Sequence, residues 1–379
     1  MFEQKESLEF FGAFFCAYIC PMMHQPIYLD FAATTPVHPE VLSSILPYFT
    51  DIYGNAGSSA HLYGWRAADA VEQSRATIAS YLHVKPAEVI FTSGATESIN
   101  LAIRGFLQGK PKAHLITSLL EHKAVLEVFR ALEAEGWDVT YLVDVNELAN
   151  AIRPDTILVS FMLVNNELGT ILDYEPILRI CEERDICFHS DATQAMGKLT
   201  LSTTLPHLLS FSGHKIYGPK GIGALIAKVP IQPIQYGGGQ ERGLRPGTLP
   251  VPLIVGLAKA VEMIPVWLSK SAFYESAKAR ISALLPLINS PQNSVPSILN
   301  FTLKGADWER MFQVLQGMAF SNGSACNAKT ELPSHVLKAL GYSDEDALAS
   351  GRISLGYFTT DEEIDRVCEI ITQNLPKIL

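Results

Sequence analysis

The sequence predicts an α/β fold with a largely parallel β-sheet, and three observations point to it. Short runs rich in β-branched residues alternate with helical patterns along much of the chain. Polar residues collect where several of these predicted strands end. The 379 residues, of which 48% are hydrophobic and 18% charged, are enough for a large domain and a smaller one, each with its own core.

The first strand pattern spans residues 89–93 and passes through Gly94 into a helix that we expect to begin near Thr96. The amides and dipole at the start of such a helix bind anions, so residues 93–97, Ala95 and Thr96 among them, are a candidate phosphate site. An ordinary tight turn capped by Thr96 would give the same pattern. Further buried strands are predicted at residues 113–117, 139–142, 157–164, 186–190, 208–212 and 223–227.

Three of these strands run directly into polar clusters, at residues 165–167, 191–194 and 212–215. Each cluster alone is typical of a capped turn, since Asn, Asp and Ser are the usual turn residues. Together they predict a ligand site, because ligands of open α/β sheets bind beyond the carboxyl ends of the strands.

Lys215 lies among small, polar and turn-forming residues in the segment 210–221. A lysine amine whose pKa is lowered by burial and by its neighbours attacks carbonyl compounds, and the resulting Schiff base is how proteins hold pyridoxal phosphate. Ser212 and His214 are candidates to bind the phosphate beside it. A solvated lysine in a glycine-rich loop explains the segment equally well when it is taken alone.

The charge and the cysteine pattern disfavour several classes of protein. A net charge of −10 and a pI near 5.5 argue against direct nucleic-acid binding, which needs a basic face. The 6 cysteines are scattered without a CxxC pair, which indicates neither a disulfide framework nor a zinc site, and no metal is expected. These features favour a reducing cytoplasm and a small-molecule or protein partner.

Residues 1–25 are predicted to be a variable N-terminal extension. The apolar stretch at 10–20 is too short to span a bilayer, which takes about 20 residues in a helix. Acidic residues outnumber the single lysine before it, so neither a secretory signal nor a membrane anchor is indicated. We expect Met22 or Met23 to be the working start, and a structured N-terminal helix is the alternative.

Between about Pro26 and Ile371 the chain carries an ordered set of longer motifs. They are Phe-Thr-Ser-Gly-Ala-Thr-Glu-Ser at 91–98, Glu-His-Lys-Ala-Val at 121–125, Val-Asn-Asn-Glu at 164–167, Asp-Ala-Thr-Gln at 191–194, the segments 210–221 and 237–248, Gly-Ser-Ala-Cys at 323–326 and Arg-Ile-Ser-Leu-Gly at 352–356. In order and spacing they resemble the cysteine desulfurases of the NifS/IscS type, in the class V aminotransferase family of pyridoxal-phosphate-dependent enzymes. The resemblance implies fold type I, the aspartate aminotransferase-like architecture, with Lys215 as the cofactor-binding lysine.

The resemblance also implies roles for residues around this lysine. Asp191 pairs with the pyridine nitrogen and keeps it protonated, so that the ring acts as an electron sink. His122 stacks on the ring and shuttles protons, although a solvated histidine at a helix start is the alternative. Arg352 takes the substrate carboxylate in a bidentate fork. The other contacts implied are Ala95, Thr96, Gln194, Ser212 and His214 to the cofactor, Asn166 to cofactor and substrate, and Thr248 to a phosphate across a dimer interface.

Cys326 separates this family from other vitamin B6 enzymes. It lies in a run of small residues at 321–330 that suits a mobile loop rather than a core. By the resemblance, its thiolate attacks the sulfur of a cysteine–cofactor adduct, which leaves alanine and places a persulfide on Cys326. An unreactive exposed thiol is the alternative, and the other cysteines are expected to be structural.

The resemblance further predicts the domain organisation. A large cofactor-binding domain would span residues 35–255, and a small domain would combine 26–34 with 256–379. The cofactor would lie in the cleft between them, near the subunit interface of a homodimer. The chain ends at Leu379, before the tail with which housekeeping members of the family help to dock the iron–sulfur scaffold protein, so docking on that scaffold is not implied.

The sequence departs from the family pattern in four places. The connection between Tyr141 and Thr156 is short, and Leu163 stands where a histidine is common. Pro246 and Asn322 replace the usual small residues of their motifs. None of these changes removes a reacting group.

Three functions from different classes follow. The first is a cytoplasmic cysteine desulfurase that takes sulfur from L-cysteine and passes it to a protein acceptor, for iron–sulfur cluster assembly or tRNA thiolation. The second is a selenocysteine lyase or a small-substrate class V aminotransferase, of which Cys326 argues against the aminotransferase. The third is a non-catalytic paralogue, which has no need of Lys215, His122, Asp191, Arg352 and Cys326 together.

Overall fold

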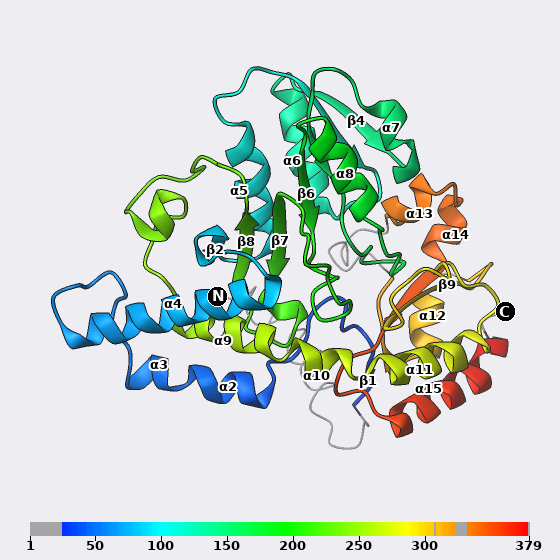
Figure 1. Ribbon diagram of the computed structural model, residues 1–379. Helices are drawn as coiled ribbons and strands as arrows, with labels where there is room; N and C mark the ends of the chain where they lie inside the picture. The colour runs from blue at the N-terminus through cyan, green and yellow to red at the C-terminus, as the bar shows by residue number, and fades with distance from the viewer. Residues whose placement is uncertain (1–24, 307, 323–331, 378–379) are drawn as a thin grey trace, which may run out of the picture.

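The computed structural model describes residues 25–306, 308–322 and 332–377 (Figure 1). Its centre is a 7-stranded sheet with the strand order β2-β8-β7-β6-β5-β3-β4. Every neighbouring pair is parallel except the two made by β8, which runs antiparallel to both β2 and β7. The prediction of a largely parallel sheet is therefore confirmed. The strands are β2 (Val89–Thr92), β3 (His114–Ser118), β4 (Asp138–Leu142), β5 (Thr156–Ser160), β6 (Cys187–Asp191), β7 (Leu208–Ser212) and β8 (Gly223–Ala227).

One predicted strand is longer than the observed one. The apolar run at 157–164 predicted a strand to its end, but β5 stops at Ser160. The Phe161 and Leu163 amides still donate to the main-chain oxygens of His189 and Asp191 in β6. The run therefore continues beside the sheet after the regular strand ends, which explains why its side chains are all apolar and buried.

Helices cover both faces of this sheet (Figure 1). Successive side chains of a strand point to opposite faces of the sheet, so they pack into two separate cores. In β2, Val89 and Phe91 pack into the core shared with α4, α8 and α9, while Ile90 packs into the core under α5 and α6. These helices are α4 (Leu62–Leu82), α5 (Ala95–Leu107), α6 (Lys123–Ala134), α8 (Glu175–Glu183) and α9 (Val251–Glu262).

A further hydrophobic core lies at the C-terminal side of the molecule. It packs Leu29 with residues between Ala277 and Ile371 around two small two-stranded sheets. One sheet pairs β9 with β11 in antiparallel fashion, and the other pairs the N-terminal β1 in parallel with β10. The elements are β1 (Ile27–Tyr28), β9 (Ile298–Thr302), β10 (Met318–Ala319), β11 (Ser350–Ser354), α11 (Ser271–Ser282), α12 (Trp308–Val314) and α15 (Asp361–Asn374).

This separate core is consistent with a second, smaller domain, although the boundaries 35–255 and 26–34 with 256–379 stay predictions. The part of α9 beyond Val255 packs into the first core rather than the second. The short helices are α2 (Pro39–Ile45), α3 (Pro47–Thr50), α7 (Leu148–Ala151), α10 (Ile264–Leu268), α13 (His335–Ala339) and α14 (Asp344–Leu348).

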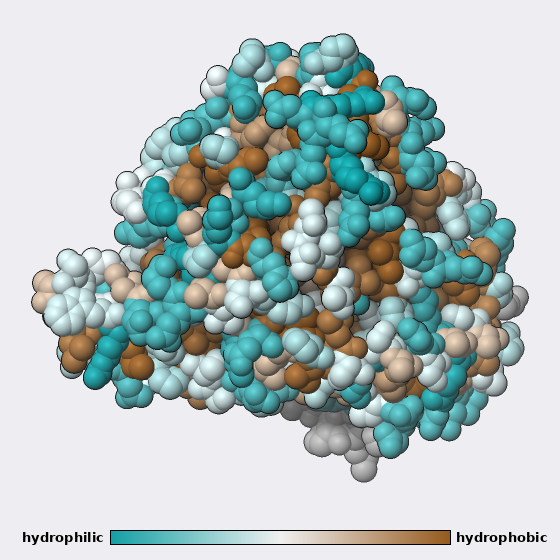
Figure 2. Space-filling view, in the orientation of Figure 1, coloured by the Kyte–Doolittle hydropathy of each residue, from teal (hydrophilic) through white to brown (hydrophobic). Residues whose placement is uncertain are grey.

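The surface is mostly hydrophilic on the face shown in Figure 2, with hydrophobic residues in between. Some of these lie at the projecting end formed by α3 and the start of α4, at the left of the view, where Phe49 and Trp65 are more than half exposed. No single helix within the described ranges is long and apolar enough to cross a membrane, and one bent pair, 251–262 with 264–282, passes by length and composition only.

Candidate active site

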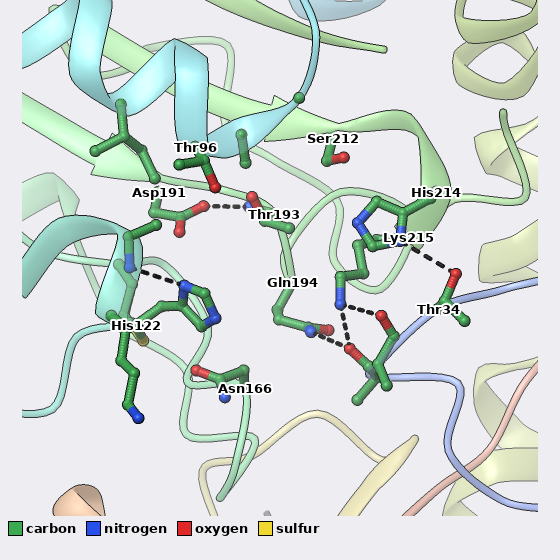
Figure 3. A pocket seen from close by; sticks show the side chains of 18 of the residues that line it. Thr34, Thr96, His122, Asn166, Asp191, Thr193, Gln194, Ser212, His214 and Lys215 are labelled. Carbon is green, nitrogen blue, oxygen red and sulfur yellow. Dashed lines mark hydrogen bonds between the residues drawn. The ribbon is translucent and has the colours of Figure 1, made fainter. Parts of the chain in front are cut away.

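A cavity of about 520 Å³ opens at the carboxyl edge of the sheet. Its walls come from the ends of β6 and β7, the starts of α5 and α6, and the N-terminal segment 32–34 (Figure 3). The sheet therefore brings together residues far apart in the chain, as the pattern of polar strand ends predicted. The predicted site residues that line the cavity are Ala95, Thr96, His122, Asn166, Asp191, Gln194, Ser212, His214, Lys215 and Arg352.

An anion-binding corner lies at the start of α5, where Gly94 is the N-cap. Gly94 has φ +152°, which residues with a side chain rarely adopt, and it offers no side chain to cap the helix. The first amides of α5, at Ala95 and Thr96, are thus left without a side-chain cap at the positive end of the helix dipole. Ser212 lies beside Gly94 and adds a hydroxyl. This corner suits a phosphate group.

Lys215 ends a 3₁₀ turn, Gly213–Lys215, that follows β7 directly. Its Nζ donates hydrogen bonds to the main-chain oxygens of Ala32 and Ala33, at 2.6 and 2.5 Å (Figure 3). No sequence pattern pointed to Ala32 and Ala33, because they contribute main-chain oxygens rather than side chains. The amine of Lys215 is thereby held at the wall of the cavity, opposite the α5 corner.

Asp191, the last residue of β6, places its carboxylate at the cavity edge and is 7% exposed. Its Oδ1 accepts a hydrogen bond from the Thr193 amide at 2.9 Å, and Gln194 Nε2 donates to the Ala32 oxygen at 2.8 Å. Thr193 Oγ1 and Gln194 Oε1 are buried and have no hydrogen-bond partner within residues 25–306, 308–322 and 332–377. Buried polar atoms are nearly always paired, so two unpaired ones on a cavity wall indicate a polar ligand there.

His122 is the N-cap of α6, and its Nδ1 accepts a hydrogen bond from the Ala124 amide at 3.1 Å. Burial lowers the pKa of His122, with the Asp191 charge raising it and the Lys215 charge lowering it further. The imidazole is therefore neutral near pH 7, and the accepting Nδ1 places its proton on Nε2. Figure 3 shows this second ring nitrogen pointing into the cavity.

Two residues beside His122 were not predicted as site residues. Glu121 is fully buried, and burial raises its pKa well above the usual value. Its Oε1 accepts a hydrogen bond from the Met162 amide at 2.6 Å, while no described residue pairs with Oε2. His335 lines the cavity and contacts the Glu121 main-chain oxygen through Nε2 at 2.9 Å. Only the 121–125 motif hinted at Glu121, and no pattern hinted at His335.

His214 lies on the Lys215 side of the cavity, where its Nδ1 meets Thr34 Oγ1 at 3.2 Å (Figure 3). Burial, and then the positive charge of Lys215, lower the pKa of His214 to about 4. The ring is therefore neutral at physiological pH. A neutral imidazole has one N–H group, which can donate a hydrogen bond to a bound phosphate.

Arg352 projects from the fully buried strand β11 and is 1% exposed. Its Nη1 donates to the Asn166 main-chain oxygen at 2.7 Å, and its Nη2 pairs with Asp30 Oδ1 at 2.7 Å. Arg352 borders the cavity as predicted. Sequence reasoning missed Asp30, because nothing in the sequence around it signals a partner more than three hundred positions away.

Lys198 is a second buried lysine near the site and was also missed. Its Nζ and the Ser297 hydroxyl are both buried and find no partner in the described part of the chain. Both residues line a small separate cavity of about 20 Å³ that Lys215 also borders. Burial, followed by the charges of Lys215 and Arg352, lowers the pKa of Lys198 to about 7. A space of this size and polarity fits one water molecule.

One predicted site residue, Thr248, is not brought to the cavity by this chain. Thr248 is exposed and lies outside the cavity lining. Its predicted role across a subunit interface therefore stays a prediction. Cys326 lies outside the described residues, and its predicted role also stays a prediction.

The fold and site together define a class of protein. A mostly parallel sheet carries, at its carboxyl edge, a lysine amine, a carboxylate, an imidazole and an anion-binding helix start around one cavity. This is the arrangement of enzymes that hold an aldehyde cofactor with a phosphate through a lysine.

Comparison with known proteins shows which family of such enzymes this chain resembles. The Aminotransferase class-V family matches residues 27–367. The cysteine desulfurase IscS of Salmonella typhi is 44% identical over 387 residues, covering 94% of each chain. A solved NifS-like protein superposes with a TM-score of 0.86 at 36% identity over 93% of this chain and all of its own. A structure of SspA in complex with cysteine gives 0.80 at 41% identity over 88% of this chain and all of its own.

The chain therefore belongs to the class V aminotransferase family, and within it to the cysteine desulfurases. Members of this family depend on pyridoxal phosphate, which agrees with the resemblance and the fold predicted from sequence.

Proposed function

We propose that this cysteine desulfurase converts L-cysteine to L-alanine and takes the sulfur onto Cys326 as a persulfide. The observation that carries the proposal is the meeting, in one cavity, of the Lys215 amine, the Asp191 carboxylate and the Arg352 guanidinium. An amino acid that binds there would place its amine toward Lys215 and its carboxylate toward Arg352. The SspA structure with cysteine supports a substrate of this size and charge.

The residues present fit pyridoxal phosphate. The α5 corner with Thr96, Ser212 and His214 would hold the phosphate, and Asp191 would pair with the pyridine nitrogen. Thr193 Oγ1 and Gln194 Oε1, which have no partner among the described residues, also favour a polar ligand on this side of the cavity. When bound, the cofactor supplies an electron sink that stabilises negative charge at the substrate α-carbon.

The protein's own residues would manage the substrate and its protons. Lys215 accepts a proton at Nζ when it is not covalently engaged, since the Ala32 and Ala33 oxygens stabilise an ammonium there. Neutral His122 presents an Nε2 proton to the cavity and is suited to donate it to the substrate. Asn166 lies beside Arg352 and would contact the substrate.

The sulfur transfer balances without an external oxidant. The Cys326 thiolate forms an S–S bond to the substrate sulfur while the substrate C–S bond breaks. The carbon fragment keeps the electron pair of that bond and takes up a proton, which yields alanine. Persulfide and alanine together contain all the atoms of the thiol and cysteine that react.

The wider role is part of the same proposal. The enzyme would act as a homodimer, with Thr248 reaching the phosphate of the partner subunit, and would pass sulfur to a protein acceptor for iron–sulfur cluster assembly or tRNA thiolation. The IscS relative, a cysteine desulfurase 44% identical to this chain, supports the desulfurase activity on which this role rests. A reducing cytoplasm suits Cys181, Cys187 and Cys368, which are unpaired thiols.

The decisive experiment incubates the purified protein with L-cysteine in the absence of reductant. Mass spectrometry should find a gain of one sulfur on the peptide that contains Cys326, with alanine as co-product. Cys326→Ser should keep the cofactor's visible absorbance and lose the persulfide, whereas Lys215→Ala should lose the absorbance of the lysine-bound cofactor. Normal sulfide release by Cys326→Ser would reject Cys326 as the sulfur carrier.

A further inference from the structure

The charge of Arg352 is balanced inside the protein by one carboxylate. Its guanidinium is almost wholly buried, and within the described residues its ion-pair partner is Asp30, at 2.7 Å from Nη2. Isolating a buried guanidinium from water is costly unless a counter-ion and hydrogen bonds replace the hydration. Asp30 and the Asn166 main-chain oxygen supply these partners on the two terminal nitrogens. Nε has no hydrogen-bond partner among the residues that the structure describes.

Asp30 is placed for this contact by the main chain around it. The Ser354 amide donates to the Leu29 oxygen at 2.7 Å, and Asp30 forms a parallel bridge with Ser354, two residues beyond Arg352 on β11. This bridge brings the Asp30 side chain next to the guanidinium of Arg352. Arg352 borders the cavity and Asp30 does not, whereas Ala32 and Ala33, which follow Asp30, do.

We propose that Asp30 is a positioning residue that makes the site selective for substrates with a carboxylate. It holds the Arg352 guanidinium fixed in one orientation, without touching the substrate itself. The proposal rests on the proposed function only in taking Arg352 as the group that binds the substrate carboxylate. Without Asp30, the guanidinium would keep its hydrogen bond to the Asn166 oxygen but lose the partner of Nη2, so it would be free to turn about that one contact and would lose its prepared geometry.

A binding titration of the holoenzyme tests this without requiring sulfur transfer. L-Alanine and ethylamine differ only in the carboxylate, and either amine perturbs the visible absorbance of the lysine-bound cofactor. The dissociation constant of each is measured for the wild type and Asp30→Asn. We expect Asp30→Asn to weaken L-alanine binding by about tenfold or more, and to change ethylamine binding by less than about twofold.

A matched control and a double-variant cycle separate positioning from general damage. Asp365→Asn removes an aspartate that pairs with Arg280 at the surface, and should leave both constants unchanged. In an Arg352→Gln background, Asp30→Asn should have no further effect on L-alanine, because Asp30 acts through Arg352. If Asp30→Asn alone does not fold, the double variant should fold, since it leaves no unpaired buried guanidinium.

Three results would overturn the proposal. Equal weakening of L-alanine and ethylamine would reduce Asp30 to general support of the fold. Tighter binding of L-alanine by Asp30→Asn would make Asp30 a competitor for Arg352 rather than its support. A full Asp30→Asn effect in the Arg352→Gln background would show that Asp30 acts elsewhere. None of these depends on persulfide formation, so failure of the desulfurase proposal would be recognised separately by its own mass-spectrometric test.

Discussion

Lys198 has an amine that is costly to protonate inside the protein. Its Nζ is fully buried and has no protein partner among the described residues, and burial lowers its pKa from 10.5 to about 7. Because the unfolded chain binds this proton more tightly, the stability lost to Lys198 is greatest below pH 7 and disappears as the pH rises toward 10.5. The shift corresponds to roughly 5 kcal/mol at most.

Lys198→Met should therefore stabilise the protein, and more so at low pH. We expect the gain in unfolding free energy over the wild type to be largest near about pH 6.5 and to shrink by about pH 9.5. Denaturant melts of both proteins across this range check it. The exposed Lys304→Met should show no pH-dependent difference. A gain for Lys198→Met that stays constant with pH would mean that the buried group does not titrate as described.

At the residue scale, the sequence could predict side chains but not main-chain partners. Asp191, Ser212 and Lys215 were predictable because each follows a strand pattern and carries recognisable chemistry. Asp30 and the oxygens of Ala32 and Ala33 were not, because their contacts depend on which distant segments the fold places beside them. Glu121 and Lys198 gave no local signal of their unusual burial.

At the scale of elements, strand β8 packs closely against the turn before α5 and so shapes the anion-binding corner. A Cβ on Gly223 would lie 2.5 Å from the Phe211 oxygen and 2.7 Å from Gly94 Cα. Both obstacles are main-chain atoms, which cannot move aside as a flexible side chain can. Any residue larger than glycine must therefore push β8 away from the turn.

Gly223→Ala should accordingly weaken cofactor binding. We expect the dissociation constant of pyridoxal phosphate to rise by about tenfold or more, because the amides of Ala95 and Thr96 lose their alignment. Equilibrium dialysis of the apoprotein measures it. Gly239→Ala is the matched control, since an added Cβ there meets nothing within 4 Å. Unchanged affinity in Gly223→Ala would show that the corner tolerates the displacement.

A buried ion pair fastens the loop around residues 240–243 to the sheet. Both Glu241 oxygens contact Arg75, at 2.7 and 2.9 Å, and one also accepts the Phe91 amide of β2. The side chains of Arg75 and Glu241 are 4% and 0% exposed. The Glu241 backbone has φ 48°, which is strained for a residue with a side chain, so the pair also holds an unfavourable conformation.

Glu241→Gln should destabilise the protein by about 3 kcal/mol, because it leaves the Arg75 charge buried with a weaker partner. Thermal melts give the loss. Glu72 also contacts Arg75 but is 65% exposed, so Glu72→Gln should cost less than about 1 kcal/mol. Similar losses in the two variants would mean that burial does not control the strength of these pairs.

The strand patterns in the sequence predicted where the strands lie along the chain better than the direction in which each strand runs. All 7 strands of the main sheet fall on runs that the sequence indicated. The antiparallel direction of β8 follows from the short connection that returns the chain beside β7, and strand composition carries no record of it. The premature end of β5 was equally hidden, because its buried continuation remains apolar.

The molecule as a whole leaves apolar side chains uncovered at the projecting end of Figures 1 and 2. Leu46, Phe49, Tyr53 and Trp65 are each more than half exposed. Clusters of this kind mark surfaces that another protein covers. They support the proposed homodimer.

Phe49→Glu should therefore shift the protein from dimer to monomer, since a buried unpaired carboxylate at the interface opposes association. Sedimentation velocity distinguishes the two species. Phe312→Glu, which places the same charge on an exposed phenylalanine of α12, should remain dimeric. A monomeric wild type would reject the dimer, and with it the role of Thr248 across the interface.

The pairing of β1 with β10 has a consequence for biosynthesis. Residues 27–28 leave the ribosome early, yet their strand partners are residues 318–319, and Arg352 binds Asp30 from still later in the chain. The segment that holds Lys215 in place is therefore anchored only after these much later residues have been synthesised. Cofactor capture by a correctly assembled site must therefore wait for the synthesis of residues 318–319 and 352, and a product truncated before residue 318 would lack these contacts to the segment that holds Lys215.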